Sequence, residues 1–280
     1  MPTLDDLKNT LCLGIAGNFA GHLEQAGETP DFVNVKTKEA KAPKGIFPYY
    51  VPGSEKQVGE FPLSDCTIKY PQDLAENAHL QAEPEVCVLF QAKYEYGKIA
   101  SLQPVAFAAF NDCSIRKPGA KKISEKKNWG PETKGIAADF LPVSSLDEGG
   151  ELESFRIASF LIRDGEIHIY GNDSAVNSYS YFYGKLQEWM IETLNHQADF
   201  GPLENLNQIV HQAGFPKQLM ISLGATTYTE FGENVFLQPG DKIKIYVYDG
   251  KQNTSEEIAA HASGQPVDLR KASVLQQQIR

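Results

Sequence analysis

Two glutamates two positions apart open an apolar run, and their spacing suits them to chemistry. Glu83 and Glu85 flank a proline and precede the apolar stretch 86–90. In a strand, residues i and i+2 point to the same face and lie roughly 6–7 Å apart, so both carboxylates can reach one cation. Asp112 follows a second apolar run, 105–110, and could supply a third oxygen ligand.

A set of three carboxylates predicts a hard divalent cation. Oxygen ligands alone suit Mg²⁺, or Mn²⁺ or Ca²⁺, rather than zinc. Without a cation, three carboxylates around one point would repel one another and raise their pKa values. The alternative is that Glu83 and Glu85 are a solvated strand edge, and the spacing alone favours that alternative.

The apolar patterns predict a β-rich chain with a few helices. Runs rich in β-branched and aromatic residues, separated by turn residues, predict strands at 11–16, 84–90, 104–110, 155–162, 166–170, 218–223 and 242–248. Helices are expected at 181–195 and 203–212, with a short capped turn at 3–9. Residues 17–28, which contain Gly17 and Gly21, predict a mobile loop with at most one helical turn.

These elements predict an α+β fold dominated by β-structure. The irregular spacing of the strands fits neither a parallel βαβ sheet nor a regular sandwich. We expect an N-terminal segment, 1–70, with the histidine-bearing loop and an irregular, proline-rich stretch at 36–62. A catalytic β-rich domain, 71–250, and a polar C-terminal tail, 251–280, would follow.

Composition argues against several classes of partner. The net charge of −10 is unfavourable for binding nucleic acid or an anionic membrane. No apolar stretch approaches the roughly 20 residues of a membrane span, and the first residues lack a signal-peptide profile. The four cysteines are scattered without a CxxC pair, as expected for reduced thiols. A cytoplasmic location is therefore expected.

An ordered series of short motifs resembles the fumarylacetoacetate hydrolase superfamily. The matching segments are Asn18-Phe19-Ala20-Gly21-His22, Glu83-Pro84-Glu85, Asn111-Asp112-Cys113-Ser114-Ile115-Arg116, Trp129 with Lys134, Asp164-Gly165-Glu166 with Gly171-Asn172-Asp173-Ser174, Leu223-Gly224-Ala225-Thr226-Thr227 and Leu237-Gln238-Pro239-Gly240-Asp241. The resemblance implies a mixed β-roll or sandwich of the superfamily's C-terminal-domain type, with a few flanking helices. It also implies a homodimer, and that Glu83, Glu85 and Asp112 hold the metal.

The resemblance further implies an activity. It indicates a divalent-metal-dependent hydrolase that cleaves a C–C bond in a small anionic oxo- or diketo-acid, an acylpyruvate-like compound, through a metal-bound enolate. Besides the metal ligands, the expected site residues are catalytic His22, Glu24, Gln25 and Lys134, and substrate-binding Arg116, Thr226 and Thr227. His22 would be the general base, oriented by Glu24, Gln25 or Glu28, while Lys134 would stabilise an oxyanion or hold the substrate's carboxylate.

Departures from the superfamily's pattern leave alternatives open. Gln25 stands where Glu is usual, and residues 224–227 read Gly-Ala-Thr-Thr rather than T-G-T-P. The alternatives are a metal-dependent decarboxylase or isomerase of a β-oxo-acid, and a non-catalytic member that only binds a ligand. The lysine-rich segment 116–127 is either a solvated face or an electropositive mouth for an anionic substrate.

Overall fold

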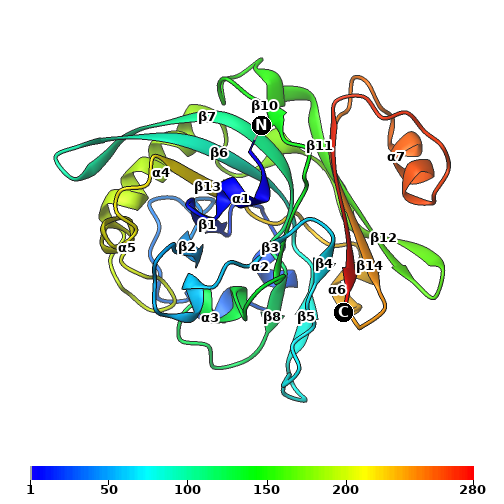
Figure 1. Ribbon diagram of the computed structural model, residues 1–280, viewed down its shortest axis with the longest axis horizontal. Coiled ribbons are helices and arrows are strands. Elements are labelled where there is room, and N and C mark those ends of the chain that lie inside the picture. The colour runs from blue at the N-terminus through cyan, green and yellow to red at the C-terminus, as the bar shows by residue number, and fades with distance from the viewer. Residues whose placement is uncertain (1) are drawn as a thin grey trace.

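A curled sheet of eight strands surrounds the main hydrophobic core (Figure 1). The structure, a computed structural model, describes residues 2–280. The strands, in spatial order, are β2 (Gly45–Tyr50), β1 (Leu11–Ala16), β13 (Gln218–Ser222), β6 (Pro84–Glu95), β7 (Lys98–Asn111), β9 (Lys134–Ile136) and β3 (Leu63–Ser64), with β10 (Leu141–Pro142) paired to β7. The long antiparallel pair β6–β7 forms the middle of this sheet.

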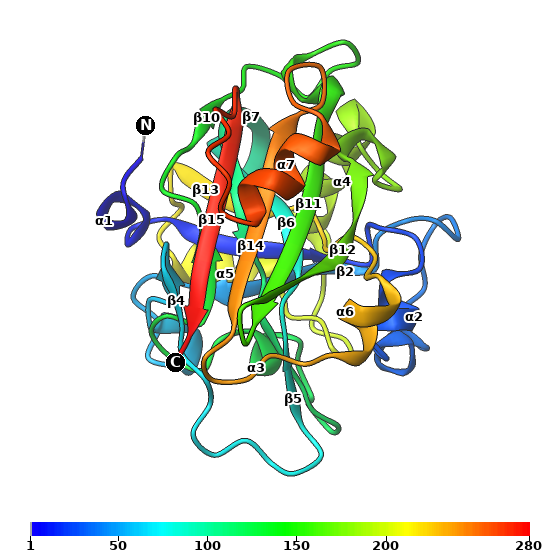
Figure 2. The ribbon, with the colours of Figure 1, turned by 90° about the vertical axis from the view of Figure 1, so that its right-hand side faces the viewer.

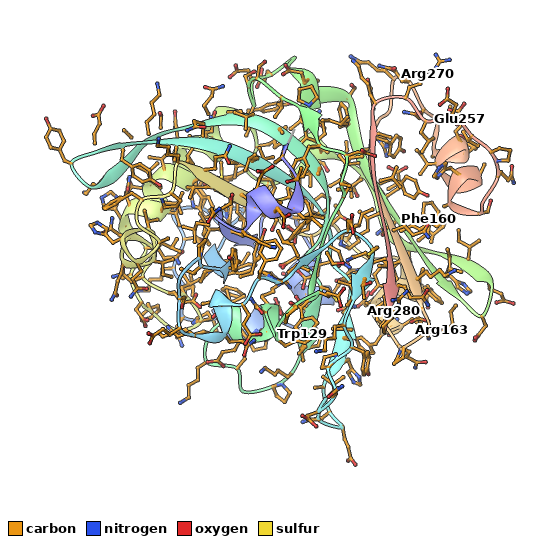
Figure 3. The ribbon with its side chains drawn as sticks, in the orientation of Figure 1. Trp129, Phe160, Arg163, Glu257, Arg270 and Arg280 are labelled. Carbon is orange, nitrogen blue, oxygen red and sulfur yellow. The ribbon has the colours of Figure 1, made fainter. Side chains whose placement is uncertain are left out.

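A second sheet packs beside the first. Its strands are β12 (Glu166–Ala175), β11 (Phe155–Arg163), β14 (Lys242–Asp249), β15 (Ala272–Ile279) and β4 (Thr67–Ile68). Helix α7 (Ser255–Ala262) lies across its outer face (Figure 2). Phe160 on that face (Figure 3) joins a small separate core with Tyr246 and Ile258. A two-stranded ribbon, β5 (His79–Gln81) with β8 (Ser114–Arg116), completes the β-structure.

The remaining helices are short, apart from one. They are α1 (Leu4–Leu7), α2 (His22–Gln25), α3 (Ser124–Lys127), α4 (Tyr183–His196), α5 (Leu206–Gln212) and α6 (Glu230–Asn234), with 3-10 turns η1 (Thr29–Phe32), η2 (Gln57–Gly59), η3 (Glu151–Ser154) and η4 (Val176–Ser178). Across residues 2–280, no helix combines the length and the apolar character needed to cross a membrane. The predicted β-dominated α+β class is confirmed.

The irregular stretch expected at 36–62 is wrong in its middle. Residues 45–50 form the buried strand β2 at the edge of the curled sheet. Pro48 lies inside this strand, opposite Leu13 of β1. An edge strand tolerates proline because one of its sides has no partner strand, and a nitrogen on that side donates no ladder hydrogen bond. Pro48 therefore marks an edge strand, whereas Pro43, Pro52 and Pro62 lie outside the strands.

The polar tail expected at 251–280 ends in a strand of the second sheet, β15, and contains helix α7. Strand β15 pairs with β14 from Ala272 to Gln278. Gln277 is buried, and its amide accepts from Asn111 at 3.0 Å and donates to the carbonyl of Thr67 at 3.0 Å. Gly135 leaves the space for this amide, since a Cβ there would lie 2.1 Å from Gln277 Oε1. Glutamines that are fully hydrogen-bonded can be buried, so polar composition misled the prediction.

The segment of residues 17–28, here called the His22 segment, is fastened to the β-structure through Gln25. Its single helical turn, α2, begins after Gly21, whose φ of 86° favours glycine. The Gln25 amide accepts from Tyr228 N–H at 2.9 Å and donates to the Tyr228 carbonyl at 3.2 Å. It also donates to Glu233 at 3.0 Å. A glutamate could not make the two donor contacts.

Helix α3 is fastened to the loop before α5 by Glu204. Ser124 donates its hydroxyl to one carboxylate oxygen of Glu204 at 2.5 Å. Lys122 donates to the carbonyl of Leu203 at 2.7 Å. Burial raises the pKa of Glu204 to about 7, against the opposing effects of Ser124 and Lys122. These two bonds hold the start of α3 against this loop.

The raised pKa of Glu204 predicts a pH-dependent stability. The pKa of Glu204 is 4.5 in the unfolded chain and about 7 in the folded protein. Between pH 4.5 and about 7 the unfolded chain has released a proton that folded Glu204 keeps, so wild-type stability falls as pH rises. Glu204→Gln removes this ionisation and preserves the acceptor for Ser124. Its stabilisation relative to wild type should grow from pH 5 to pH 8, by up to about 3 kcal/mol. Urea unfolding at each pH measures it, with exposed Glu76→Gln as the control. A pH-independent difference would contradict the assignment.

The two hydrogen bonds that Gln25 donates predict the effect of placing a glutamate at this position. Gln25→Glu sets a carboxylate against the Tyr228 carbonyl and against Glu233, at a cost of about 1–3 kcal/mol. Amide hydrogen exchange within 17–28 should accelerate roughly tenfold or more, with a smaller change elsewhere. The neighbouring exposed Glu24→Gln is the matched control. Unchanged exchange in Gln25→Glu would show that this contact does not hold the segment.

Candidate active site

Pairing of β6 with β7 brings three carboxylates together. Asp112, just past the end of β7, donates its backbone N–H to the carbonyl of Glu83 at 3.0 Å, directly before β6. Glu85 lies two residues further on and shares the face of Glu83. One carboxylate oxygen from each of the three residues lies within 4.8 Å of the others. All three side chains are buried. They are called the carboxylate triad below.

Three buried bases surround the triad. Lys127 lies 2.8 Å from Glu83 Oε2 and 2.6 Å from Asp112 Oδ2. Arg116 lies 2.8 Å from the other oxygen of Glu83, and Lys134 lies 3.0 Å from the other oxygen of Asp112. The bases arrive from separate elements, namely α3, β8 and β9. Such pairing offsets the large cost of taking carboxylates out of water.

The three carboxylates differ in their proton affinity. Burial acts to raise the pKa of Glu83, but Lys127 and Arg116 outweigh burial, and the pKa falls below its usual range. Burial and the negative charges of Asp112 and Glu83 raise the pKa of Glu85 well above its usual range. Burial also raises the pKa of Asp112, against the opposing ammonium groups. Glu85 is therefore the triad member that most lacks a positive partner.

A glycine turn holds the third carboxylate. Gly224 donates its N–H to Glu85 Oε2 at 2.9 Å. The φ of Gly224 is +112°, a conformation that other residues rarely adopt. The segment that follows carries Thr226, whose carbonyl reaches His22. The late Gly-Ala-Thr-Thr motif thus connects the triad to the histidine.

The donor set of the triad fits a hard divalent cation. Its ligands are carboxylate oxygens only, the set that Mg²⁺ and Mn²⁺ take. Among residues 2–280, Glu83 Oε1 and Asp112 Oδ1 accept no well-aligned hydrogen bond, although Arg116 and Lys134 lie within ion-pair distance. These buried oxygens can accept further contacts, and Glu85 beside them lacks a positive partner. A bound cation would supply both.

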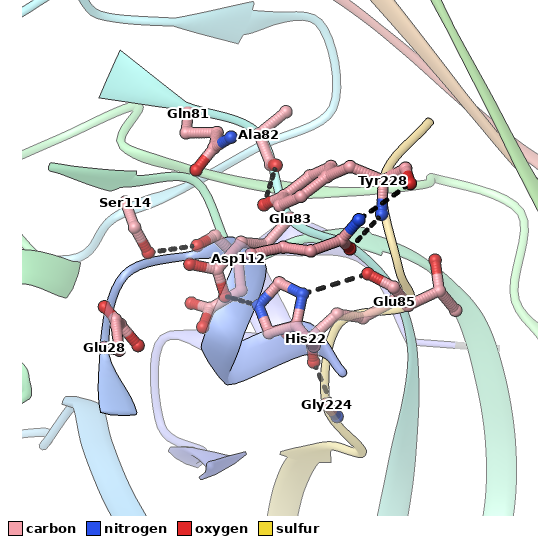
Figure 4. Close-up of polar contacts among 12 residues, drawn as sticks. His22, Glu28, Gln81, Ala82, Glu83, Glu85, Asp112, Ser114, Gly224 and Tyr228 are labelled. Atoms are coloured by element: carbon pink, nitrogen blue, oxygen red, sulfur yellow. Dashed lines mark hydrogen bonds and ion pairs between the residues drawn. The ribbon is translucent and has the colours of Figure 1, made fainter. Parts of the chain in front are cut away.

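His22 faces the triad from α2 (Figure 4). Its Nδ1 lies 3.0 Å from the carbonyl of Thr226, a contact that only an N–H can make. The proton is therefore on Nδ1, and the unprotonated Nε2 lies 4.0 Å from Glu83 Oε2. Burial lowers the pKa of His22, outweighing the opposing effect of Glu83. The ring is thus neutral, with its basic nitrogen turned toward the triad.

The acidic partners expected for His22 lie elsewhere. Glu24 is exposed on the outer side of α2, and Gln25 is occupied by Tyr228 and Glu233. Glu28 is buried but bonds Arg116 at 2.7 Å and Lys126 at 2.9 Å. The expectation that one of these side chains orients the imidazole is wrong, because the Thr226 carbonyl occupies its Nδ1 side.

The other expected site residues already have protein partners. The guanidinium of Arg116 bonds Glu28, Glu83, Gln81 and Tyr228. Lys134 is fully buried and contacts Asp112 and the carbonyl of Cys113. Thr227 accepts from Asn172 at 3.0 Å and is only partly buried. Arg116 and Lys134 therefore position carboxylates in this structure.

Sequence reasoning missed the role of Lys127 at the triad and the burial of Lys126 beside it. Lys126 and Lys127 were expected on a solvated face or at an electropositive mouth, and both are buried. Glu28, offered only as a partner for His22, instead joins the His22 segment to α3 and β8. No local sequence pattern distinguishes Lys127 from the other lysines of the same basic run. Lys121, in that run, is exposed, whereas Lys127 is buried.

The site is closed. The cavity between the His22 segment and the triad has a volume of about 10 Å³, room for roughly one water molecule. It is lined by His22, Glu28, Glu83, Asp112 and Lys127, with Phe47 across from the lysine. A larger ligand therefore needs the His22 segment to move.

Solved structures share this fold over 96% of the chain. "Crystal structure of Cg1458 with inhibitor" has a TM-score of 0.56 at 15% identity and is covered over 76% of its length. A protein assigned to the fumarylacetoacetate hydrolase family, from Yersinia pestis CO92, has a TM-score of 0.53 at 14% identity, with 92% covered. A 2-keto-3-deoxy-D-arabinonate dehydratase complexed with magnesium and 2,5-dioxopentanoate has a TM-score of 0.50 at 14% identity, with 72% covered. The expected fold of the fumarylacetoacetate hydrolase type is confirmed.

Sequence comparison gives a family but no activity. No curated protein sequence matches the chain. A family model matches residues 28–279, which include the triad, all three of its bases and every strand except β1. The chain therefore belongs to that family, which is described as a family of unknown function (DUF5718).

Proposed function

We propose that this chain is a divalent-metal-dependent enzyme that hydrolyses a C–C bond in a small oxo- or diketo-acid. The observation that carries the proposal is the buried carboxylate triad faced by a neutral histidine whose unprotonated Nε2 points toward it. A cation site and a base that border one small cavity are the parts that this reaction needs.

The proposed metal ligands are Glu83, Glu85 and Asp112. Mg²⁺ or Mn²⁺ bound there would polarise the substrate's carbonyl and stabilise negative charge that develops on its oxygen. The structural neighbour with magnesium holds 2,5-dioxopentanoate, an oxo-acid of the proposed substrate class, in the same type of fold. Arg116 and Lys134 keep Glu83 and Asp112 in position from behind.

The proposed general base is His22. Its Nδ1–H is held by the Thr226 carbonyl, so Nε2 can take a proton from water. Burial keeps the ring neutral and ready to accept that proton. Thr226 and Thr227 are the proposed hydrogen-bond donors to the substrate's carboxylate. Thr227 lies beside Gly21, where the His22 segment meets the site.

A second candidate is a metal-dependent decarboxylase or isomerase of a β-oxo-acid. A specific observation favours it: the Nδ1 side of His22 meets a neutral carbonyl rather than a carboxylate. An imidazolium formed by proton transfer would therefore lack a charged partner behind it. Decarboxylation needs the cation but no water-activating base, so this weakness would not affect it.

Removal of one triad carboxylate tests the metal site. Glu85→Gln should abolish Mn²⁺ binding in calorimetry, because one of three oxygen ligands is lost. The same variant should raise the melting temperature of the metal-free protein. A neutral amide avoids the cost of burying a carboxylate beside Asp112 and Glu83, which is what raises the pKa of Glu85. Exposed Glu95→Gln at the far end of β6 is the control. Unchanged Mn²⁺ affinity in Glu85→Gln would remove the triad from the metal site.

Turnover tests the reaction and separates the two candidates. With Mg²⁺ or Mn²⁺, we expect release of a carboxylic acid from an acylpyruvate, and none after chelation. His22→Gln should reduce hydrolysis about 10²–10⁴-fold with little change in Mn²⁺ affinity. Exposed His211→Gln is the control. Decarboxylation of oxaloacetate that survives in His22→Gln would favour the second candidate. Metal-independent turnover, or none with either class, would contradict both.

A further inference from the structure

Lys127 holds a position that no other base in residues 2–280 shares, since its ammonium contacts two triad carboxylates at once. Its nitrogen is 2.8 Å from Glu83 Oε2 and 2.6 Å from Asp112 Oδ2. Arg116 contacts only Glu83 within the triad, and Lys134 contacts only Asp112. The residue is 2% exposed, so water does not weaken these contacts.

A divalent ion would need the same oxygens. Mg²⁺ binds carboxylate oxygens at about 2.0–2.1 Å. An ion on Asp112 Oδ2 would therefore lie less than about 5 Å from an ammonium that is 2.6 Å from the same atom. Both groups are cations in a buried site, where like charges repel more strongly than in water. Glu83 Oε1 and Asp112 Oδ1 have spare acceptor capacity, but Arg116 and Lys134 lie 2.8 Å and 3.0 Å from them, so an ion bound there would still lie beside a positive charge.

We propose that Lys127 is an internal cation that occupies the triad in the metal-free protein and is displaced when a divalent ion binds. The inference rests on the proposed metal site and adds the residue that sets its affinity. The ion must remove Lys127 from two carboxylates, so part of its binding energy is spent on that displacement. The metal-free fold, in return, is held together without the ion.

The surroundings of Lys127 offer a place for the displaced side chain. It lies on α3, a single helical turn, and four rotatable bonds separate its ammonium from the backbone. The ring of Phe47 is 5.0 Å from the ammonium and presents an aromatic face to it. The small cavity of the site also borders both residues. In this displaced position the ammonium would remain beside the cavity, where an anionic ligand needs a counter-charge.

The adjacent Lys126 provides a matched control. It is buried on the same turn and carries the same charge, but it contacts Glu28 and Asp31 rather than the triad. Replacing either lysine by methionine removes one positive charge and retains an unbranched side chain. Only the replacement of Lys127 removes the proposed competitor of the metal.

Calorimetry with MnCl₂ on the full chain, freed of metal by chelation, tests the inference. Lys127→Met should bind Mn²⁺ at least tenfold more tightly than wild type, whereas Lys126→Met should stay within about threefold. In chelator, Lys127→Met should melt at a lower temperature than wild type. Saturating Mn²⁺ should raise its melting temperature by more than that of wild type. If Lys127→Met does not fold, Lys127→Gln, whose amide can bond one carboxylate without charge, serves for the same measurement.

The outcomes separate this inference from the proposed function. Equal or weaker Mn²⁺ binding in Lys127→Met, with binding in wild type, would overturn the internal-cation role and leave the metal site in place. Absence of Mn²⁺ binding in wild type, Lys127→Met and Lys127→Gln would overturn the metal site, and the inference with it. Binding by Lys127→Met but not by wild type would support the inference in its strongest form.

Discussion

The meeting of buried carboxylates where β6 begins and β7 ends is the constraint on which the rest of the site depends. Backbone pairing places Glu83 and Asp112 side by side, and Glu85 joins them on the same face. Like charges in a buried place must be neutralised, by protons, by bases or by an ion. Bases from three separate elements neutralise part of this charge, so α3, β8 and β9 must all be in position for the site to form.

The sequence predicts the parts of this arrangement that are local. The i, i+2 spacing places Glu83 and Glu85 on one face of a strand, and the apolar runs place Asp112 at the end of another strand. That the three carboxylates meet was implied by the resemblance to the fumarylacetoacetate hydrolase superfamily. The strand β1 and the helices α4 and α5 also lie where periodicity predicts them, within a few residues. Strand β2 and strand β15 were missed because Pro48 and Gln277 look unsuited to buried strands, and only their tertiary partners show otherwise.

The remaining site contacts join residues far apart in the sequence, and no local pattern specifies them. Thr226 reaches His22 across more than two hundred positions, and Glu28 meets Lys126 across ninety-eight. The Gln25 departure, which first raises doubt about catalysis, has a structural explanation. Its amide serves as both donor and acceptor to one backbone unit, a role that glutamate cannot fill. The residue type at that position therefore reports on anchoring more than on proton transfer.

A cavity of about 10 Å³ has a consequence for how any substrate would be measured. Only protein molecules in which residues 17–28 have moved outward could accept a substrate. The observed dissociation constant would therefore equal the intrinsic constant divided by the fraction of the protein in that open state. Contacts that stabilise the shut form, such as Glu28 with Arg116, would weaken apparent binding without touching the ligand. Variants that loosen the segment could thus gain affinity while losing exclusion of bulk water during the reaction.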